Sequence, residues 1–581
     1  MDKRTVLFII LSVLIWFGYI QFIAPRFTSK EQPAAITKEI SQQSDKKDVN
    51  SPDLTQSTTQ SKPGEERKIP TKYQQPSNII LKLKKLENNY FQATISNKGA
   101  AIESFTFKQY KAAKNASQLS IINSVESDKY ALTLRFIQSD IDIENNLWEI
   151  VEETAAMIKF RYTTPDGLVI YKVFSLNKYN YTLDYNISLE NISDSPITST
   201  LVINGTNGLP YETYNFVDIT GLHAYTDKEN KWYIKEKPLP AELAKLKKSE
   251  NIKSDVLTQG QDNVSWTGIT SKYFSTILVP LSNTDIATYN FDLIESPVTN
   301  SASAQAAELL NLNFHLQTKE LSLKPGETKR LDFIFYAGPK ETSELATFTN
   351  LGFDKLLSYG WFGFISKILL LILAGLYGIF KNYGIAIIAL TIIIKVILFP
   401  ITKKGQVSMY RLQKLTPRIK ALQEQYKNDK QRLGVEQLKL WKEYGVNPLS
   451  GCLPMLLQIP VFFGLYWALA LAIELRQAPF MLWINDLSQA DQLCKLPFPI
   501  LGATYLHVLP LIMTISWLIQ SLTQPKSPDP QTRQQQKLFV FMPLIFGILF
   551  YNVPSGLTLY WFTSTLLGIV EQIIIKKYYF K

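Results

Sequence analysis

The chain has 581 residues and a net charge of +11, from 61 Lys and Arg against 50 Asp and Glu, and its mean hydropathy is close to zero. That average would suit a soluble enzyme. However, apolar residues are concentrated in the first 25 and the last 220 positions, and this distribution excludes a soluble enzyme. Residues 76–345 carry 27 Lys and Arg against 32 Asp and Glu, whereas residues 402–447 carry 11 against 4. Because the basic excess lies in short segments beside apolar runs, it indicates the positive-inside bias of a membrane protein rather than a globular nucleic-acid binder.

Residue types that carry enzyme chemistry are scarce. The chain has two cysteines, Cys452 in an apolar run and Cys494 outside one, and three scattered histidines. A structural zinc site needs about four Cys or His ligands at tight spacings, so neither cysteine belongs to one, and we expect no disulfide between them. HExxH, the P-loop, the Rossmann glycine motif and GxSxG are all absent. We therefore predict no catalytic residue, no metal site and no cofactor.

The N-terminus carries an apolar run, Val6–Ala24, preceded by Lys3 and Arg4. The run is close to the ~20 residues that cross about 30 Å of hydrocarbon as a helix. A cleaved signal peptide has the same basic start, but no A-x-A site follows, and Pro25 would hinder cleavage. We expect residues 1–25 to be an uncleaved transmembrane anchor that starts in the cytoplasm. The next segment, residues 26–75, is rich in Ser, Gln, Lys, Pro and Thr and is expected to be a flexible tether.

Residues 76–345 show the pattern of β-strands. Apolar and polar residues alternate without interruption in Tyr179–Glu190, so one face of this segment is expected to be buried. The turn Lys324–Glu327 leads into another alternating segment, Leu331–Phe335. Turn residues recur along the region, which predicts a many-stranded antiparallel sandwich. One helical insertion is expected at Pro240–Lys248.

After Glu341 the pattern becomes helical and strongly apolar. Each apolar run has about 16–23 residues, enough to span or nearly span a bilayer. The runs are Trp361–Phe380, Gly384–Ile401, Leu453–Ile473, about Ile500–Leu522, Leu538–Val553 and Gly556–Ile575.

The basic segments orient these helices. With the N-terminus inside, the β domain lies outside the cytoplasmic membrane, and a single crossing must bring basic residues 402–447 to the cytoplasm. We select Gly384–Ile401 as that crossing, because Trp361–Phe380 has aromatic residues at both ends and Lys367 within it, which suits a helix in the outer interface. We expect six spans with both termini in the cytoplasm. The expected domains of this half are a linker with the interfacial helix, 346–383, and a five-helix core with a cytoplasmic hairpin, 384–581.

Lys395 is the sharpest functional candidate, because it lies ~12 Å above the cytoplasmic boundary near Lys403. A bare ammonium there costs roughly 2.5–3.5 kcal/mol on insertion. Either Lys395 snorkels to the inner interface, or it faces a wet cavity together with Thr391, which lies on the same helical face. In the second case Gln458 and polar residues of the last span line the cavity. Such a site would attract cargo with a few acidic or polar residues and ease its passage without any bond being made or broken.

The segment after Thr402 predicts a helical hairpin. The apolar residues of Leu412–Tyr426 are spaced 3-4-3-4, as in a coiled-coil seam, and Pro417 either kinks this helix or marks a restart. Asn428-Asp429 is expected to form the turn, and Leu438 and Trp441 of the return helix are expected to face back.

The basic side chains of the hairpin allow two interpretations. They either only fix the topology or form a docking surface for incoming chain, ribosomal RNA or acidic headgroups. The candidates are Arg411, Lys414, Arg418, Lys420, Lys427, Lys430 and Arg432. Two other ionisable residues have ordinary explanations, Glu571 at the inner end beside Lys576, and His507 at an interface.

Several long motifs are shared with a known family. They are Asn447–Pro454 with Gln458–Phe462, Glu474–Phe480 with Trp483-Ile484 and Asp486-Leu487, Phe541-Met542-Pro543, Pro554–Leu557, and, in the β region, Lys272-Tyr273-Phe274 and Tyr336–Lys340. On these residues the chain resembles the YidC family of bacterial membrane protein insertases over nearly its whole length apart from the tether.

The resemblance implies an N-terminal anchor, a five-helix insertase core and a large periplasmic β-supersandwich in the bacterial inner membrane, as in Gram-negative members. It implies a hydrophilic groove, open to cytoplasm and lipid, that receives nascent membrane proteins and releases them into the bilayer, alone or with the Sec translocon. Lys395 stands where members commonly carry arginine, which keeps the charge but loses the planar five-donor fork. The same resemblance places Thr391, Gln458, Ile459, Phe462, Tyr560 and Trp561 along the groove or against the passing helix.

The implied partners are nascent chains, the lipid bilayer and the Sec translocon, with the ribosome and signal recognition machinery at the cytoplasmic face, and no small-molecule substrate. The tail after Lys577 is short, so it offers little for ribosome docking. Two rival functions stay open. A secondary transporter also uses polar residues at mid-membrane, although no internal repeat is visible among the spans. A membrane-anchored carbohydrate-binding domain would put the activity in the β region and leave the last 220 residues as an anchor.

Overall fold

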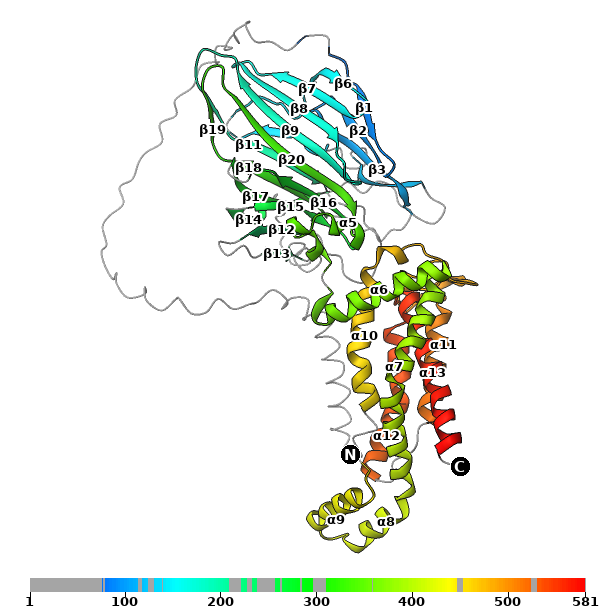
Figure 1. The fold of residues 1–581 in the computed structure, drawn as a ribbon. Helices are drawn as coiled ribbons and strands as arrows, with labels where there is room; N and C mark the ends of the chain where they lie inside the picture. Colours follow the sequence, from blue (N-terminus) through cyan, green and yellow to red (C-terminus); the bar gives the residue numbers. More distant parts are fainter. Residues whose placement is uncertain are drawn as a thin grey trace, which may run out of the picture.

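The computed structural model describes residues 76, 79–112, 117–123, 130–137, 139–207, 221–226, 232–237, 256–261, 264–282, 285–295, 310–357, 359–446, 453–523 and 530–579. The expected anchor over residues 1–25, the tether, the helical insertion at Pro240–Lys248 and the motif around Cys452 lie outside the described residues. Figure 1 shows a β domain above an elongated group of helices.

The β domain spans the strands β1 to β20, and the strand pairs in its described residues are antiparallel. A nine-stranded sheet has the order β13-β12-β15-β16-β20-β9-β8-β7-β6, a five-stranded sheet the order β14-β17-β18-β11-β5, and a four-stranded sheet the order β1-β2-β3-β4. The strands are β1 (Leu83–Glu87), β2 (Phe91–Ser96), β3 (Ala101–Lys111), β4 (Gln118–Asn123), β5 (Leu134–Phe136), β6 (Glu149–Glu153), β7 (Met157–Thr163), β8 (Leu168–Leu176), β9 (Thr182–Asn191), β10 (Ile197–Ser199), β11 (Leu201–Asn207), β12 (Gly221–Thr226), β13 (Trp232–Lys237), β14 (Val256–Gln261), β15 (Val264–Thr270), β16 (Phe274–Pro280), β17 (Ile286–Glu295), β18 (Leu310–Thr318), β19 (Leu321–Leu323) and β20 (Thr328–Pro339).

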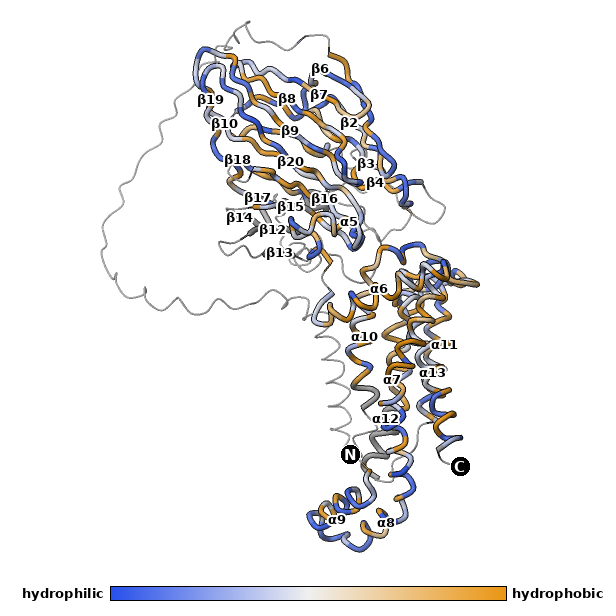
Figure 2. The backbone as a smooth tube through the Cα atoms, viewed as in Figure 1, coloured by the Kyte–Doolittle hydropathy of each residue, from blue (hydrophilic) through white to orange (hydrophobic). Residues whose placement is uncertain are grey.

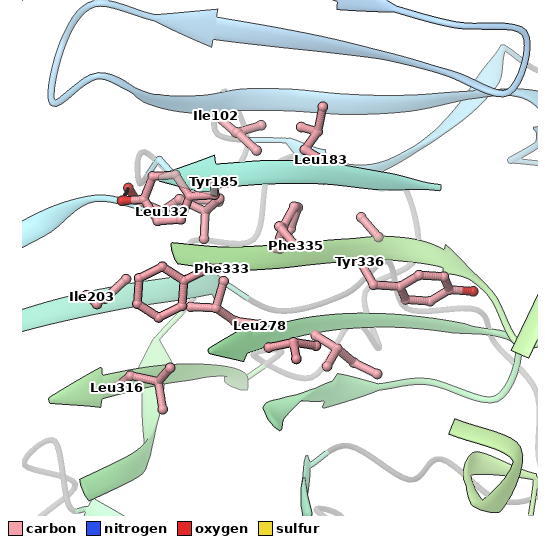
Figure 3. Packing of buried hydrophobic residues seen from close by; sticks show 14 of the residues in the cluster. Ile102, Leu132, Leu183, Tyr185, Ile203, Leu278, Leu316, Phe333, Phe335 and Tyr336 are labelled. Carbon is pink, nitrogen blue, oxygen red and sulfur yellow. Dashed lines mark hydrogen bonds between the residues drawn. The ribbon is translucent and has the colours of Figure 1, made fainter. Parts of the chain in front are cut away.

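The alternation in the sequence produces this packing. In β9 every second residue from Leu183 to Leu189 is fully buried, and β9 pairs with β20 so that Leu183 lies opposite Phe335. Figure 3 shows that Ile102 of β3, Leu183 of β9 and Leu316 of β18 point into one interior, and all three belong to a single apolar cluster. The two smaller sheets therefore share their core with the large one.

The side chain of Lys172 lies inside this core. Lys172 is fully buried and donates from Nζ to the main-chain oxygens of Gly99 at 2.9 Å and Leu132 at 2.7 Å. Its ammonium also lies 5.4 Å from the ring centre of Trp148. Burial lowers the pKa of Lys172 well below its usual range, because a charged group is costly away from water. The two carbonyl acceptors explain how the side chain is tolerated there.

The helical part follows after short connecting turns. Its elements are α5 (Thr342–Ala346), η3 (Thr349–Leu351), η4 (Phe353–Leu356), η5 (Gly360–Phe362), α6 (Gly363–Phe380), α7 (Tyr383–Lys414), α8 (Thr416–Gln425), α9 (Lys430–Glu443), α10 (Leu453–Leu471), η7 (Ile473–Leu475), β21 (Lys495–Ile500), β22 (Ala503–Tyr505), α11 (Val508–Thr523), α12 (Pro530–Leu549) and α13 (Ser555–Tyr579). In Figure 1, α6 lies across the end of the other helices that is nearest the β domain, while α8 and α9 lie at the opposite end.

Among the described residues, three helical stretches are long and apolar enough to cross a membrane, Gly360–Phe380, Tyr383–Lys414 and Ser555–Tyr578. Helices α10, α11 and α12 contain shorter apolar stretches. Figure 2 shows hydrophobic residues along α7 and α11 and hydrophilic residues gathered at α8 and α9.

The predicted start of one apolar helix is wrong. We expected a helix from about Ile500, but Lys495–Ile500 and Ala503–Tyr505 form a β-hairpin, and α11 begins only at Val508. Two prolines in β21 cannot donate the hydrogen bonds of a helix. The turn residues Leu501 and Gly502 have φ of 52° and 81°, as a two-residue hairpin turn requires.

The hairpin expected after Thr402 also differs from expectation. Helix α7 does not end at Ile401 but continues to Lys414, and α12 likewise begins before Leu538. Pro417 marks a restart, because it stands in the first turn of α8, where the missing N–H costs nothing. Leu438 faces solvent, so its predicted inward orientation is wrong. Trp441 packs against the small apolar cluster of the hairpin, as expected.

Candidate functional site

Lys395 lies half-buried in the apolar part of α7, where that helix packs on α13. Its Nζ lies 3.9 Å from the position that a Cβ of residue 568 would occupy, and the Nε2 of Gln520 from α11 fills the same position. Glycine at 568 therefore provides the space in which the two polar side chains lie. Within the part of the chain that the structure describes, no hydrogen bond and no ion pair within 4.0 Å reaches Lys395.

A carboxylate faces the same region. Glu571 of α13 is buried and lies one turn beyond Gly568, so it is on the same side of that helix. The hydroxyl of Thr402, from α7, donates a hydrogen bond to its Oε1. Glu571 and Lys395 are close enough to interact electrostatically. Glu571, which was expected to have an ordinary role at the inner end beside Lys576, is thus a buried residue with a partner on α7.

The polar contacts continue between α11 and α13. The hydroxyl of Thr523 donates to the Oε1 of Gln572 at 2.7 Å, and both lie at the end of the helices away from the β domain. Ser516, one turn before Gln520, is buried and donates to its own helix at the oxygen of Ile512 at 2.8 Å. A line of polar side chains thus runs between otherwise apolar helices. Because polar groups within a membrane are costly, such residues are candidates for a functional role.

A second group of predicted residues lies closer to the β domain. Tyr560 of α13 is buried, and its hydroxyl accepts a hydrogen bond from the Nε2 of Gln458 on α10. Next to it, the rings of Phe462 and Trp561 meet edge to face with centres 4.7 Å apart. Tyr560 and Gly568 are eight residues apart, so the two groups are separated by about 12 Å along α13.

The structure thus brings together four of the predicted groove residues, Gln458, Phe462, Tyr560 and Trp561. Thr391 is buried one turn before Lys395, and its hydroxyl donates to the oxygen of Ile387 at 2.7 Å, within α7. Ile459 is half-buried on α10 and does not belong to the apolar cluster that contains Phe462 and Trp561.

The predicted basic residues of the hairpin lie on its surface. Arg411, Lys414, Arg418, Lys420, Lys427 and Arg432 are exposed, while the side chain of Lys430 is outside the described part of the structure. Two guanidinium groups lie over tyrosine rings, Arg418 at 4.9 Å from the centre of Tyr444 and Arg432 at 5.6 Å from that of Tyr426. The other basic residues of this set are exposed on the same surface.

Other expected residues have ordinary surroundings. His507 is buried and its Nδ1 bonds to the main-chain oxygen of Asp491. Cys494 is exposed and free. Among the described residues, no three His, Cys, Asp or Glu side chains gather closely enough to hold a metal ion.

Sequence reasoning missed Glu571, Thr402, Gln520 and Gln572 as members of the site. A signal existed for Glu571, since an acidic residue in an apolar run is a functional candidate by default. Its neighbours were not visible, because only the packing of α7, α11 and α13 shows which faces meet.

Comparisons with known proteins show the family of the chain. The family model of the YidC periplasmic domain matches residues 84–372, and the model of the 60Kd inner membrane protein matches residues 375–581. The membrane protein insertase YidC of Geotalea daltonii is 30% identical over 99% of both chains, and that of Syntrophus aciditrophicus is 33% identical over 84% of this chain and 83% of its own. A solved structure of an active YidC insertase covers 88% of this chain at 17% identity, with a TM-score of 0.34. The chain belongs to the YidC family of membrane protein insertases.

Proposed function

We propose that this protein inserts membrane proteins and is not an enzyme. A nascent apolar segment enters a hydrophilic, positively charged groove within the membrane and leaves it sideways into the lipid. One observation carries the proposal, the ammonium of Lys395 held among apolar helices with no ion pair or hydrogen bond among the described residues. A charge in that position is costly, so its presence there points to a role in binding cargo that crosses the bilayer.

The physical effect is a lower barrier rather than a chemical step. A polar or acidic residue of a passing segment loses water when it enters hydrocarbon, and each unsatisfied group costs several kcal/mol. The ammonium of Lys395 offers such a residue a charged hydrogen-bond partner at depth. The aromatic pair Phe462–Trp561 and the Gln458–Tyr560 hydrogen bond join α10 to α13 about 12 Å nearer the β domain. They would contact the same segment.

The proposal includes an arrangement in the membrane. Residues 1–25 anchor the chain, residues 26–75 tether it, and residues 384–581 form a five-helix core, which makes six spans with both termini in the cytoplasm of a bacterial inner membrane. The β domain is a periplasmic supersandwich. Helix α6 lies in the outer interface within residues 346–383, which is supported by its transverse position and by the exposure of Trp361 at 93%.

The proposed partners are nascent membrane proteins, the lipid bilayer and the Sec translocon, while the basic hairpin docks the ribosome or the signal recognition machinery. Exposed basic side chains on α8 and at the ends of α7 and α9 suit an anionic partner. The comparisons support neither a secondary transporter nor a carbohydrate-binding domain on an anchor.

Crosslinking tests the groove directly. Photo-crosslinkers placed at Thr391, Phe462 and Tyr560 should capture the nascent span of a small membrane protein during its synthesis. Labelling by lipid alone would count against the groove.

Substitution of Lys395 tests the charge. Lys395→Met should reduce insertion of a cargo with acidic residues about tenfold, while Lys395→Arg should retain most of it, because the charge and not the fork is required. The matched control is Lys367→Met, which removes an exposed lysine from the apolar helix α6. Equal insertion by Lys395→Met and the control would contradict the proposal.

A further inference from the structure

Glu571 occupies an unusual place for an acidic residue. It is buried in α13, one turn beyond the glycine over which the ammonium of Lys395 lies, and it acts electrostatically on that ammonium. The two groups are nevertheless not in contact, since no ion pair within 4.0 Å joins them in the described structure. The ammonium therefore has no carboxylate in contact with it among the described residues.

Thr402 explains why the carboxylate lies away from the ammonium. Its hydroxyl donates to Glu571, and it lies seven residues, or two turns, beyond Lys395 on the same face of α7. The hydrogen bond holds the carboxylate at the level of Thr402 rather than at the level of the ammonium. The other side chains of this region, Gln520 and Gln572, are neutral amides.

We propose that Glu571 is a built-in counter-charge that sets how acidic a cargo the Lys395 site accepts, with Thr402 holding it at a fixed distance. The inference rests on the proposed insertase function and adds a specificity-determining residue to it. A cargo carboxylate beside Lys395 is attracted by the ammonium and repelled by Glu571, and both interactions are stronger between packed helices than in bulk water. A neutral polar residue in the same place is affected far less. The native pair therefore moderates the preference for acidic cargo that a lone ammonium would impose.

The test uses the full-length protein and two cargo proteins that differ only by Asp or Asn in the translocated segment next to a single span. Glu571→Gln keeps an oxygen that accepts the Thr402 hydrogen bond but removes the charge. It should raise the ratio of Asp-cargo to Asn-cargo insertion about threefold to tenfold. The matched control Glu443→Gln makes the same change on an exposed site of α9 and should leave the ratio at its native value.

A second variant covers the case in which Glu571→Gln fails to fold. Thr402→Val leaves the charge in place but removes its hydrogen-bond donor, so the carboxylate can move toward Lys395. The Asp-to-Asn insertion ratio should fall at least twofold, because the ammonium is then more completely offset. An unchanged or higher ratio in this variant overturns the inference.

The outcomes separate this inference from the insertase function. Loss of insertion in Lys395→Met together with an unchanged ratio in Glu571→Gln would leave the function standing and overturn the counter-charge. Normal insertion of both cargo proteins by Lys395→Met would instead overturn the role of the ammonium, whatever the ratio in the Glu571 variant.

Discussion

Arg476 donates a hydrogen bond of 2.7 Å from Nη2 to the main-chain oxygen of Lys111, and this contact joins the helical part to the β domain. The guanidinium also lies 5.7 Å from the ring centre of Phe274 in β16 and is largely buried. Gln477 donates to the same oxygen of Lys111 at 3.0 Å. Beside these bonds is a cavity of about 290 Å³. Its lining residues are Gln109, Tyr110, Lys111, Glu341, Ile473, Glu474, Arg476 and Gln477.

The first prediction concerns this junction. Arg476→Ala should lower the free energy of unfolding by roughly 2 kcal/mol, because it removes the charged hydrogen bond from a buried guanidinium to the main-chain oxygen at the end of β3. Protease cleavage between the β domain and α6 should become faster. Gln477→Ala removes only a neutral and more exposed bond, so its effect on both measurements should be smaller. Equal effects of the two substitutions would show that the guanidinium is not the main contact.

The second prediction concerns high pH. Burial raises the pKa of Tyr185 and Tyr336 in the β domain well above the ordinary value of 10.0. Each therefore contributes stability that is complete below about pH 10 and is lost as pH rises, because the unfolded chain then gives up its phenolic protons and the folded chain does not. The loss should approach about 1.4 kcal/mol per pH unit for each tyrosine.

Denaturant unfolding of the purified protein, followed by circular dichroism from about pH 9 to about pH 11.5, measures this slope across the tyrosine titration. Tyr185→Phe should reduce the slope, since phenylalanine has no proton to lose. Lys172 has the opposite effect on the free energy of unfolding below about pH 10.5. In that range the unfolded lysine is protonated, so raising the pH stabilises the folded chain. A Tyr185→Phe protein with the native slope would contradict the assignment.

The third prediction concerns the glycine beneath Lys395. Gly568→Leu should reduce cargo crosslinking and insertion at least fivefold, because a side chain there occupies the space of Gln520 and of the ammonium. Such overpacking should also destabilise the protein by about 1–3 kcal/mol. Gly378→Leu on α6 is the control, since nothing lies within 4 Å of a Cβ at that position. If both variants insert cargo equally well, the space at Gly568 has no part in the function.

The fourth prediction concerns the β21–β22 hairpin that stands in place of a predicted helix. Its tip exposes Phe498 at 66% and Leu501 at 52%, beside the start of α11. Apolar residues at such a position are expected to enter the outer interface of the membrane. An environment-sensitive dye on Phe498→Cys should shift to the blue in liposomes and be quenched by lipid-borne quenchers. The same dye on Leu281→Cys, an equally exposed position of the β domain, should do neither.

Local patterns were sufficient wherever neighbouring residues decide the structure. The alternation in Tyr179–Glu190 predicted β9, because a strand with one buried face repeats every two residues. The long apolar runs predicted α7 and α13, because a helix that crosses a bilayer needs a long uninterrupted apolar stretch. The same rule failed before α11, where Leu501, Gly502 and two prolines favoured a hairpin over the continuation of an apolar helix.

The sequence by itself determined that this protein has an antiparallel β domain and apolar helices, and that Lys395 is a charge within one of those helices. Periodicity and run length depend only on residues that are close in the chain. Only the tertiary structure decided what lies opposite that charge. Gly568 leaves room for it, and the hydroxyl of Thr402 holds the carboxylate of Glu571 away from it. The physical reason is that electrostatic and packing partners are set by which helix faces meet, and residues 395 and 571 are brought together by the packing of α7 on α13 rather than by any local preference.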